Sequence, residues 1–521
     1  MWYRREFTIP PAWASQRIYL HFGAVDWEST VYLNGRELGV HKGGYSTFSY
    51  DITEVLRTSS HGVQEVVVGV FDPTELADGV PVGKQRERIP GDQSILYHAT
   101  SGIWRTVWLE PVPDQHIRRV DMIPDVDKKL LSATVHGSAD AEGLECGFRV
   151  ADAGKEVALV PGRVGKTFTV PIPEPKLWFP DSPHLYDVDV WIVNKKAAEA
   201  SSAKDPAGAA DHVKSYTAMR KTALGKDRNG SLRLMLNDVF IFQMGMLDQG
   251  FWPDGLYTAP TDAALAYDIQ LTKQIGMNML RKHVKVEPDR WYYHADRLGL
   301  MVWQDMPSMC GARADTWYLD CWSANRTIGA AAKANFEAEL ATMVEQHLSF
   351  PSIVMWVVFN EGWGQYETER VVHSVKRMDP SRLVNPASGW YDAPAGDVID
   401  VHDYVQVRSP RPTWTRAAVL GEYGGLGHKI KGHLFNPKYA FAYKTFDTRE
   451  QILAAYSGLI DNITTLMANP DTALSAAVYT ELADTENEIN GVITYDRKVF
   501  RYEPSALYRI HTRMIEAGKL L

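Results

Sequence analysis

The chain has 521 residues, with 55 Lys plus Arg against 64 Asp plus Glu, which gives a formal charge of −9. A chain of this length needs more than one hydrophobic core, and its negative charge is unlike that of a dedicated nucleic-acid binder. The apolar share of 45% and the charged share of 23% are typical of globular proteins, which excludes disorder of the whole chain. We therefore expect about two to four packed domains and no nucleic-acid partner.

Cysteine content and hydropathy exclude further classes of protein. Cys146, Cys310 and Cys321 are too few and too scattered for a disulfide framework or a metal-ligand set. No stretch approaches about 18 consecutive apolar residues, and the first residues lack the apolar core of a signal peptide. The sequence therefore predicts a soluble chain without a membrane partner, and it leaves the compartment open.

The first 230 or so residues carry the pattern of β-structure. Up to about residue 112, short alternating runs are separated by turn residues, and Asn34-Gly35 between runs 31–33 and 38–40 predicts a hairpin. This segment is predicted to be a β-sandwich. A second β segment from about residue 116, with strands at 130–135 and 186–193, has the size of an immunoglobulin-like sandwich. Residues 194–212 lack periodicity and predict an exposed, mobile loop.

After about residue 232, buried strands alternate with helical patterns. Thr261 is the predicted N-cap of the first helix, and further helices are predicted at 288–298, 330–347, 366–378, 448–467 and 504–517. The eight predicted strands are 239–246, 278–284, 300–306, 353–360, 383–388, 398–404, 417–421 and 475–480. This alternation predicts a (β/α)8 barrel, whose active site lies at the C-terminal ends of the strands.

Two of these strands end in a carboxylate. The apolar run 353–359 is followed by Asn360-Glu361, and the run 418–421 is followed by Glu422. Such runs are strands buried on both faces, so Glu361 and Glu422 are expected to face each other across one barrel mouth. Two opposed carboxylates suit glycoside cleavage, in which one is protonated and the other ionised. In that setting Asn360 would bind a sugar 2-hydroxyl, and Tyr404 would hydrogen-bond Glu422 and keep it anionic.

Other polar residues at the strand ends leave alternatives open. Arg281 either pins Glu422 by charge or forms a structural ion pair within the rim. His402 either contacts substrate or fills space as a hydrogen-bonded residue, and Asp248 either binds a sugar hydroxyl or caps a loop. Trp363 and Trp390 are candidate stacking platforms for a sugar, with burial in a core as the alternative.

An acidic run near the last predicted strand contains Glu481, Asp484, Glu486 and Glu488. Its composition would suit a divalent cation, but solvated loop charge is the favoured interpretation. We find no P-loop, G-x-G-x-x-G or G-x-S-x-G motif. Phosphoryl transfer, dinucleotide chemistry and serine hydrolysis therefore lack support, and we expect no metal and no cofactor.

Several motifs together resemble glycoside hydrolase family 2, the family of β-galactosidases, β-glucuronidases and β-mannosidases. They are Asn360-Glu361, Gly421-Glu422-Tyr423-Gly424, Asn34-Gly35, Ser101-Gly102-Ile103-Trp104-Arg105 and Leu177-Trp178-Phe179-Pro180. The resemblance covers nearly the whole chain in the family's order. It implies a jelly-roll sugar-binding domain at 1–113, an immunoglobulin-like β-sandwich at 114–226 and a catalytic TIM barrel at 227–521.

The resemblance also implies a reaction. The family retains anomeric configuration, which implies Glu361 as acid/base and Glu422 as nucleophile, with the two carboxyl groups about 5–5.5 Å apart. It carries over Arg281 and, more loosely, His283 from the second barrel strand as substrate-site residues. The implied activity is an exo-β-glycosidase acting on terminal β-linked sugars, with a carbohydrate substrate as partner and homo-oligomerisation left open.

Departures from the family pattern bear on the sugar. The Asn-x-Lys of β-glucuronidases has no lysine at the corresponding stretch 488–493, and the magnesium-binding E-x-H-G run of large β-galactosidases is replaced by Gln304-Asp305-Met306-Pro307. A β-galactosidase-like activity is therefore the first expectation. β-Mannosidase, β-glucosidase or β-galactofuranosidase follow, then β-glucuronidase, and a non-catalytic carbohydrate-binding protein is the contrasting hypothesis. The strand at 2–9 normally follows several dozen residues, so we expect an incomplete first domain and allow for a lost upstream signal.

Overall fold

The computed structural model describes residues 1–56, 62–74, 79–86, 95–194, 202–309 and 328–521. The chain divides into two compact units. The first contains residues 1–72, 101–220 and 346–351, and the second contains residues 73–100, 221–345 and 352–521. The positions of Cys310 and Cys321, and residues 195–201 of the predicted mobile loop, lie outside the described residues.

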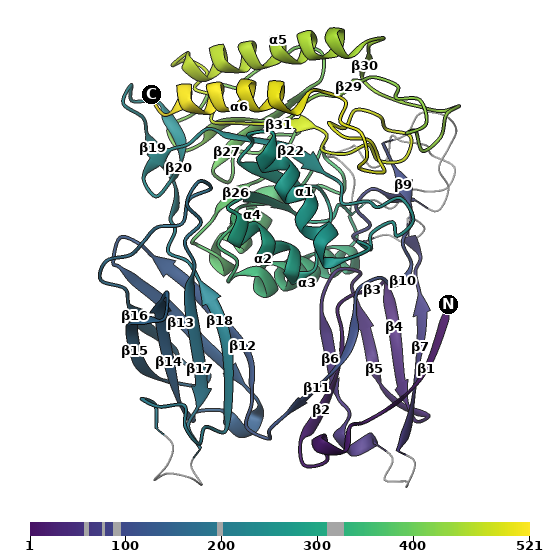
Figure 1. Cartoon of the computed structure of the whole chain (residues 1–521), viewed down its shortest axis with the longest axis vertical. Helices are drawn as coiled ribbons and strands as arrows, with labels where there is room; N and C mark the ends of the chain where they lie inside the picture. The colour runs from purple at the N-terminus through teal and green to yellow at the C-terminus, as the bar shows by residue number, and fades with distance from the viewer. Residues whose placement is uncertain (57–61, 75–78, 87–94, 195–201, 310–327) are drawn as a thin grey trace. The chain divides into compact units, whose positions relative to one another are not determined.

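The first unit begins with a β-sandwich that confirms the predicted hairpin (Figure 1). Asn34 and Gly35 have φ of 52° and 79° and join β4 to β5, as a tight hairpin turn requires. The strands alternate between buried and exposed side chains, and their inner faces form one apolar core. One sheet has the order β1 (Trp2–Thr8), β7 (Val63–Phe71), β4 (Glu28–Leu33), β5 (Arg36–Lys42); a second has β11 (Val107–Val112), β2 (Arg17–Phe22), β6 (Phe48–Asp51); β10 (Gly102–Ile103) pairs with β3 (Val25–Asp26).

A further β-sheet domain follows in the same unit. The buried faces of its two sheets share an apolar core that includes Leu131, Cys146 and Val190. The predicted loop 194–212 ends earlier than expected, because Asp211 already begins a strand that pairs with β17. The sheets have the orders β12 (Ile117–Asp125), β13 (Leu130–Gly137), β16 (Thr167–Pro171) and β15 (Lys155–Arg163), β14 (Glu145–Asp152), β17 (Tyr186–Ile192), β18 (Asp211–Thr217).

The second unit contains the predicted (β/α)8 barrel. Its eight-stranded sheet has the order β26 (Leu383–Asn385), β25 (Ile353–Val357), β24 (Met301–Asp305), β23 (Met279–Lys282), β22 (Gln243–Asp248), β31 (Ala476–Thr480), β28 (Ala417–Gly424), β27 (Val398–Asp403). The hydrogen-bonded neighbours in this order pair in parallel. The first predicted strand was misplaced: residues 239–240 form β21 (Val239–Phe240), which pairs antiparallel with β20 (Leu232–Leu236), and the barrel strand begins at Gln243. β20 also pairs with β19 (Thr222–Lys226).

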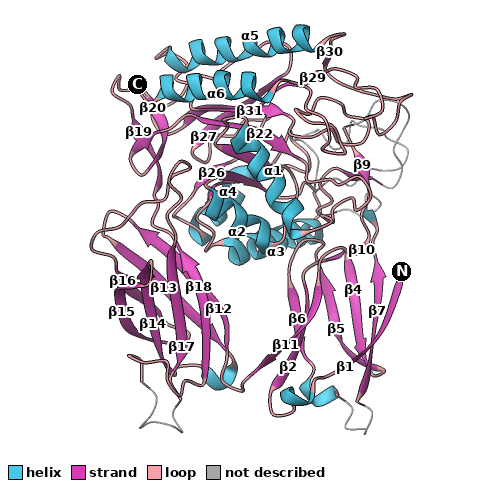
Figure 2. Cartoon of the chain, in the orientation of Figure 1, coloured by secondary structure: helices cyan, strands magenta, loops and turns pink. Residues whose placement is uncertain are grey.

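The described residues include six α-helices, and they lie around this sheet (Figure 2). The first begins as predicted, since the Thr261 side chain accepts a hydrogen bond from the backbone N–H of Ala264. Thr448 caps the fifth helix within a capping box. The helices are α1 (Asp262–Gln274), α2 (Asp289–Leu298), α3 (Ala330–His347), α4 (Thr368–Met378), α5 (Arg449–Ala468) and α6 (Pro504–Gly518). None of the helices in the described part of the chain is long and apolar enough to cross a membrane.

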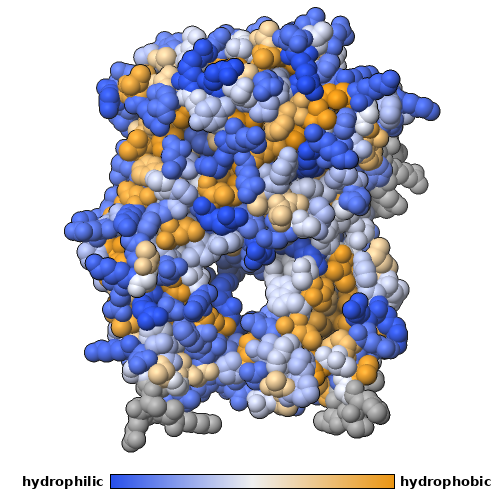
Figure 3. Space-filling view, viewed as in Figure 1, coloured by the Kyte–Doolittle hydropathy of each residue, from blue (hydrophilic) through white to orange (hydrophobic). Residues whose placement is uncertain are grey.

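Residues 73–100 belong to the barrel unit although they lie between strands of the first sandwich in the sequence. They contain β8 (Gln85–Arg86) and β9 (Tyr97–His98), which pair in parallel. The backbone N–H groups of Val82 and Gly83 both donate to the carbonyl of Ser308, just beyond β24. A loop from the early sequence thus becomes part of the barrel mouth. The face drawn in Figure 3 is mostly hydrophilic, with hydrophobic patches among the polar side chains.

Candidate active site

The polar residues selected from the sequence gather at the C-terminal ends of the barrel strands. Glu361 follows β25, Glu422 lies near the end of β28, and His402 is the penultimate residue of β27. All three side chains are buried, with exposed fractions of 4%, 2% and 7%. Rigid parallel strands deliver them to one place, as the barrel architecture predicts.

The two glutamates lie next to each other with His402 between them. One carboxylate oxygen of each glutamate and a ring nitrogen of His402 all lie within 4.8 Å of one another. His402 Nδ1 donates to Glu361 Oε1 at 2.8 Å and lies 3.7 Å from Glu422 Oε1. Burial opposes the charged imidazolium, but the carboxylates of Glu422 and Glu361 outweigh it and raise the pKa of His402. The three groups therefore lie within direct electrostatic reach of one another.

Glu422 is held as an anion by its neighbours. Arg281 Nη1 donates to its Oε1 at 3.3 Å, and the Tyr404 hydroxyl donates to its Oε2. Burial alone would raise the pKa of Glu422, but the positive charges around it, His402 first and Arg281 among the others, lower it below its usual range. The predicted hydrogen bond from Tyr404 is present. Both alternatives left open for Arg281 occur, because it contacts Glu422 and also forms an ion pair with Asp305.

Arg281 organises the centre of the mouth while fully buried. Its guanidinium makes a two-point contact with Asp305, with Nε to Oδ1 at 3.0 Å and Nη2 to Oδ2 at 2.9 Å. Nη2 also donates to Asn360 Oδ1 at 2.7 Å. His283 contacts the same carboxylate through Nδ1 at 2.8 Å, and its Nε2 lies 3.9 Å from Glu422 Oε1. Arg281 thereby fixes residues from four strand ends at once.

Two residues that support His402 were not selected from the sequence. Ser388 Oγ lies 2.7 Å from His402 Nε2 and donates to Asp400 Oδ2 at 2.6 Å. Asp400 also accepts from the backbone N–H of Gly421 at 2.6 Å, next to Glu422. Asp400 and His402 are two residues apart on β27, so the alternation of the strand already placed them on the same face. The alternation of side chains along this predicted strand was the signal in the sequence from which Asp400 could have been identified.

The remaining predicted site residues have mixed positions. Asp248 is buried, accepts from Lys282 Nζ at 2.5 Å and from the backbone N–H of Gly250 at 2.9 Å, and so does cap a loop. Trp363 is only 2% exposed and packs as a core residue in this structure, whereas Trp390 is 45% exposed. Trp390 thus keeps the accessible ring that stacking on a sugar needs, and Trp363 does not.

The acidic run at 481–488 is buried, so the favoured interpretation as solvated loop charge was wrong. Glu481, Asp484, Glu486 and Glu488 have exposed fractions of 0%, 3%, 7% and 1%. Asp484 forms a two-point ion pair with Arg501, at 2.9 and 2.8 Å, and Glu486 lies 2.9 Å from His98 Nδ1. The sequence could not reveal this, because β8 and β9, which are distant in the chain, pack beside the acidic run.

The spacing of Glu361, His402 and Glu422 would also suit the ligands of a cation. Metal binding would require the deprotonated imidazole of His402, whereas its carboxylate neighbours raise the pKa of this residue. Arg281 already supplies a positive charge beside Glu422 and would repel a cation there.

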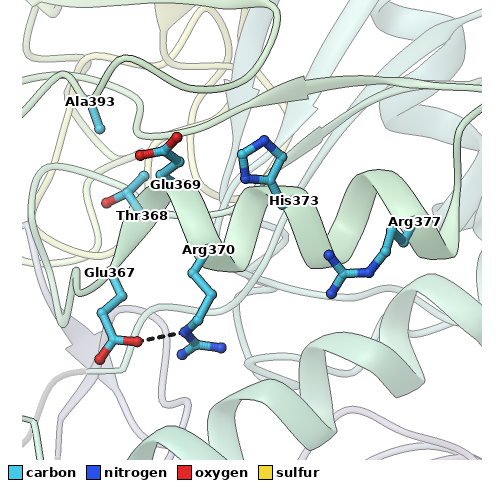
Figure 4. Close-up of a pocket in the computed structure, with 7 residues that line it drawn as sticks. All are labelled: Glu367, Thr368, Glu369, Arg370, His373, Arg377 and Ala393. Atoms are coloured by element: carbon cyan, nitrogen blue, oxygen red, sulfur yellow. Dashed lines mark hydrogen bonds and ion pairs between the residues drawn. The ribbon is translucent and has the colours of Figure 1, made fainter.

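A separate hollow lies on the outer face of α4, away from the strand ends (Figure 4). Within it, Arg370 Nε donates to Glu367 Oε2 at 2.5 Å, and the Nη atoms of Arg370 contact Glu337 at 2.9 and 2.7 Å. None of the residues that line this hollow lies on a barrel strand. The hollow is therefore separate from the carboxylate pair.

A (β/α)8 barrel that buries two carboxylates this close together at its C-terminal mouth has the geometry of the retaining glycoside hydrolases. Two models of one such family match the chain: glycosyl hydrolases family 2, sugar binding domain, at residues 1–113, and glycosyl hydrolases family 2, TIM barrel domain, at residues 259–498. Together the two matches cover more than half of the chain, which belongs to glycosyl hydrolases family 2.

Individual relatives are distant. A putative β-glucuronidase of Formosa agariphila is 25% identical over 84% of this chain and 52% of its own length. A β-galactosidase of Thermoanaerobacter pseudethanolicus is 24% identical over 73% of this chain and 48% of its own. Bacteroides uniformis β-glucuronidase 2, solved covalently bound to cyclophellitol-6-carboxylate aziridine, has a TM-score of 0.70 and 21% identity over 95% of this chain and 61% of that one. The chain spans about half the length of the curated relatives.

Proposed function

We propose that this chain is a retaining exo-β-glycosidase in which Glu422 is the nucleophile and Glu361 the acid/base. The observation that carries the proposal is the carboxylate pair, whose nearest ligand oxygens lie within 4.8 Å. Retaining enzymes place their carboxyl groups about 5–5.5 Å apart, whereas inverting enzymes leave about 6.5–9.5 Å for a water molecule. The covalent complex of the Bacteroides uniformis relative supports a mechanism with a covalent intermediate.

The surroundings of the pair support this division of roles. The nucleophile must be ionised before it attacks the anomeric carbon, and His402, Arg281 and Tyr404 favour the anion of Glu422. Attack by a Glu422 oxygen forms the glycosyl ester while Glu361 donates a proton to the leaving oxygen. Glu361 then accepts a proton from the incoming water, and the ester breaks to regenerate the Glu422 carboxylate.

Neighbouring residues prepare Glu361 for both steps. His402 Nδ1 contacts Glu361 Oε1, and Asn360 Nδ2 donates to Glu361 Oε2 at 3.5 Å. Ser388 Oγ contacts His402 Nε2, the other ring nitrogen, and Asp400 in turn accepts a hydrogen bond from Ser388. The imidazole therefore keeps its orientation while protons move. His402 is therefore a positioning residue in this proposal, and Asn360 remains our candidate contact to a sugar 2-hydroxyl.

For the sugar, we propose a β-galactoside-like neutral glycon. The curated relatives carry both the β-galactosidase and the β-glucuronidase names. The absence of a lysine at the Asn-x-Lys position, where Val492 follows Asn490-Gly491, supports a neutral sugar over a uronic acid. β-Glucuronidase is the second candidate, and the solved relative bound to a carboxylate-bearing inhibitor supports it.

Azide rescue tests the two roles. Glu422→Ala and Glu361→Ala should each lower turnover of a nitrophenyl glycoside by about 1,000-fold or more. Azide should restore Glu422→Ala by forming the α-glycosyl azide, since it attacks in place of the nucleophile. In Glu361→Ala it should form the β-glycosyl azide from the covalent intermediate. Full activity of either variant, or the same azide anomer from both, would contradict the assignment. A panel of β-galactoside, β-glucoside, β-mannoside and β-glucuronide substrates identifies the sugar.

A further inference from the structure

A second group of buried polar side chains faces the same barrel mouth. Lys84 comes from segment 73–100, and Glu481, Glu488 and Asn490 come from the loop after β31. We call these four residues the polar wall. All four are at least nine-tenths buried, with exposed fractions of 5%, 0%, 1% and 0%. The mechanism above uses none of them.

The wall is a connected structure. Tyr97 holds its two segments together, because its hydroxyl donates to Glu488 Oε2 at 2.5 Å and its ring centroid lies 5.9 Å from Lys84 Nζ. Asn490 Nδ2 donates to the other oxygen of Glu488 at 2.9 Å, and the Asn490 carbonyl accepts from the backbone N–H of Glu481 at 3.2 Å. These bonds fix the wall before any ligand binds.

The wall lies close to the reacting carboxylate. The ammonium of Lys84 lowers the pKa of Glu422, of Glu481 and of Glu488, and the charge of Glu422 raises that of Glu488. Glu481 directly follows β31, and β31 pairs with β28, the strand that carries Glu422. The wall therefore lies beside the nucleophile at the same end of the barrel, where the glycon of the proposed substrate would bind.

The wall has bonding capacity left over. Within the described ranges, no residue accepts a hydrogen bond from Lys84 Nζ or forms an ion pair with it. Glu481 Oε1 and Asn490 Oδ1 are buried without a hydrogen bond of good geometry in that part of the chain. Unpaired buried acceptors are costly, so a polar ligand that bonds them is favoured. The wall thus offers one donor and two acceptors to a ligand.

We propose that the polar wall binds hydroxyl groups of an uncharged glycon, with Lys84 donating to a sugar oxygen and Glu481 or Asn490 accepting from a sugar hydroxyl. A hydroxyl both accepts and donates, so it can satisfy a lysine and a carboxylate together. A uronate carboxylate could bind the ammonium of Lys84, but it would add a third carboxyl group next to Glu481 and Glu488, with only one ammonium to compensate. This inference rests on the proposed function and makes its substrate class specific.

The wall also argues against a divalent cation at the acidic run. Lys84 already supplies a positive charge within electrostatic reach of both Glu481 and Glu488. A cation there would have to bind beside a buried ammonium, which repels it.

The test measures kcat/KM for nitrophenyl β-galactoside, β-glucoside, β-mannoside and β-glucuronide in four proteins. They are the unmodified chain, Lys84→Met, Glu488→Gln, and Lys128→Met as a surface control, since the Lys128 side chain is 74% exposed. The unmodified chain should favour its best neutral substrate over the glucuronide by about 100-fold. Lys84→Met should lower kcat/KM for that substrate by about 10- to 100-fold, chiefly through KM. The control should change little.

Glu488→Gln separates recognition from structure. It is isosteric and removes one negative charge, so the ratio of glucuronide to neutral turnover should rise about tenfold or more. A purely structural role of Glu488 would lower kcat/KM for all four substrates by one common factor, and that result would overturn the inference. A preference of the unmodified chain for the glucuronide would overturn it as well. If Lys84→Met does not fold, Glu488→Gln carries the test. If the unmodified chain hydrolyses none of the four substrates, the proposed function fails. If it hydrolyses them but the variants leave the ratio of glucuronide to neutral turnover unchanged, only this inference is refuted.

Discussion

The hydrogen bond from Tyr404 to Glu422 should control the second half of the reaction. When the glycosyl ester forms, Glu422 loses its negative charge and the bond from Tyr404 weakens. When the ester breaks, Glu422 leaves as a carboxylate, and the same bond stabilises the developing charge. Tyr404→Phe removes only the hydroxyl, because the ring stacks on Tyr443 with centroids 3.7 Å apart and planes 2° from parallel.

A hydrogen bond to a charged group contributes about 1.5–3 kcal/mol, which corresponds to about a 10- to 150-fold change in rate. We therefore expect kcat of Tyr404→Phe to fall by that factor while kcat/KM, which reports ester formation, falls much less. KM should fall together with kcat, since the ester accumulates. Burial and the Glu422 charge raise the pKa of Tyr404 well above its usual value, so its hydroxyl is a donor throughout the working range.

The assay is a stopped-flow record of nitrophenolate release, with Tyr508→Phe on the exposed face of α6 as the control. Tyr404→Phe should show a burst equal to the enzyme concentration, and intact-protein mass spectrometry should detect one bound sugar residue. Equal losses in kcat and kcat/KM with no burst would refute the reasoning, because they would mean that Tyr404 acts before or during ester formation.

Three further predictions concern the centre, its pH dependence and the first sandwich. Arg281→Lys should lower kcat/KM by about 100-fold or more and destabilise the barrel unit by about 3–5 kcal/mol, because lysine cannot reproduce the two-point contact with Asp305. A melting curve identical to that of the parent would contradict this prediction. The pKa of Glu422 is lower in the folded than in the unfolded protein, so its ionised carboxylate stabilises the fold above about pH 4.3, and this contribution is lost as pH falls through the folded pKa. In urea titrations, Glu422→Gln should therefore lose less stability than the parent between about pH 7 and pH 3. A larger loss in Glu422→Gln would contradict the direction of this pKa shift. Gly35→Ala should destabilise the first sandwich by about 1–2 kcal/mol, because φ of Gly35 is +79°, which is unfavourable for alanine. No steric clash adds to this cost, since no atom lies within 4 Å of the added Cβ. The kcat per folded molecule should stay constant, and a drop in kcat would contradict a purely local effect.

The sequence predicted the barrel and the carboxylate pair for one physical reason. Strands buried on both faces are continuous apolar runs, and a carboxylate directly after such a run has to lie at the barrel mouth. Glu361 and Glu422 both met that condition, and the structure brings them together. The start of the first helix was predicted from Thr261, whose side chain bonds the first turn, and Thr448 caps the fifth helix in the same way.

What the sequence did not reveal depends on tertiary contacts. Lys84 lies within a segment whose own pattern belongs to the first sandwich, yet that segment packs with the barrel. Glu481 and Glu488 were interpreted as solvated because charges in a loop usually are, but both are buried, and Tyr97, which is distant in the chain, donates a hydrogen bond to Glu488. Trp363 was a candidate platform by its place near the rim, and the structure buries it.

The buried carboxyl groups at the barrel mouth have pKa values shifted in opposite directions, because the number of positive charges beside them differs. Glu422 is surrounded by His402 and Arg281, so its anion is favoured despite desolvation. Glu481 and Glu488 share one ammonium between two carboxyl groups, so burial dominates and raises the pKa of both. Lys84 acts on both sides, which means that removing it should weaken binding of the glycon and also reduce the preference of Glu422 for its ionised form. The two effects can be told apart, because the first changes KM with the substrate and the second moves the acid limb of the pH profile for every substrate alike.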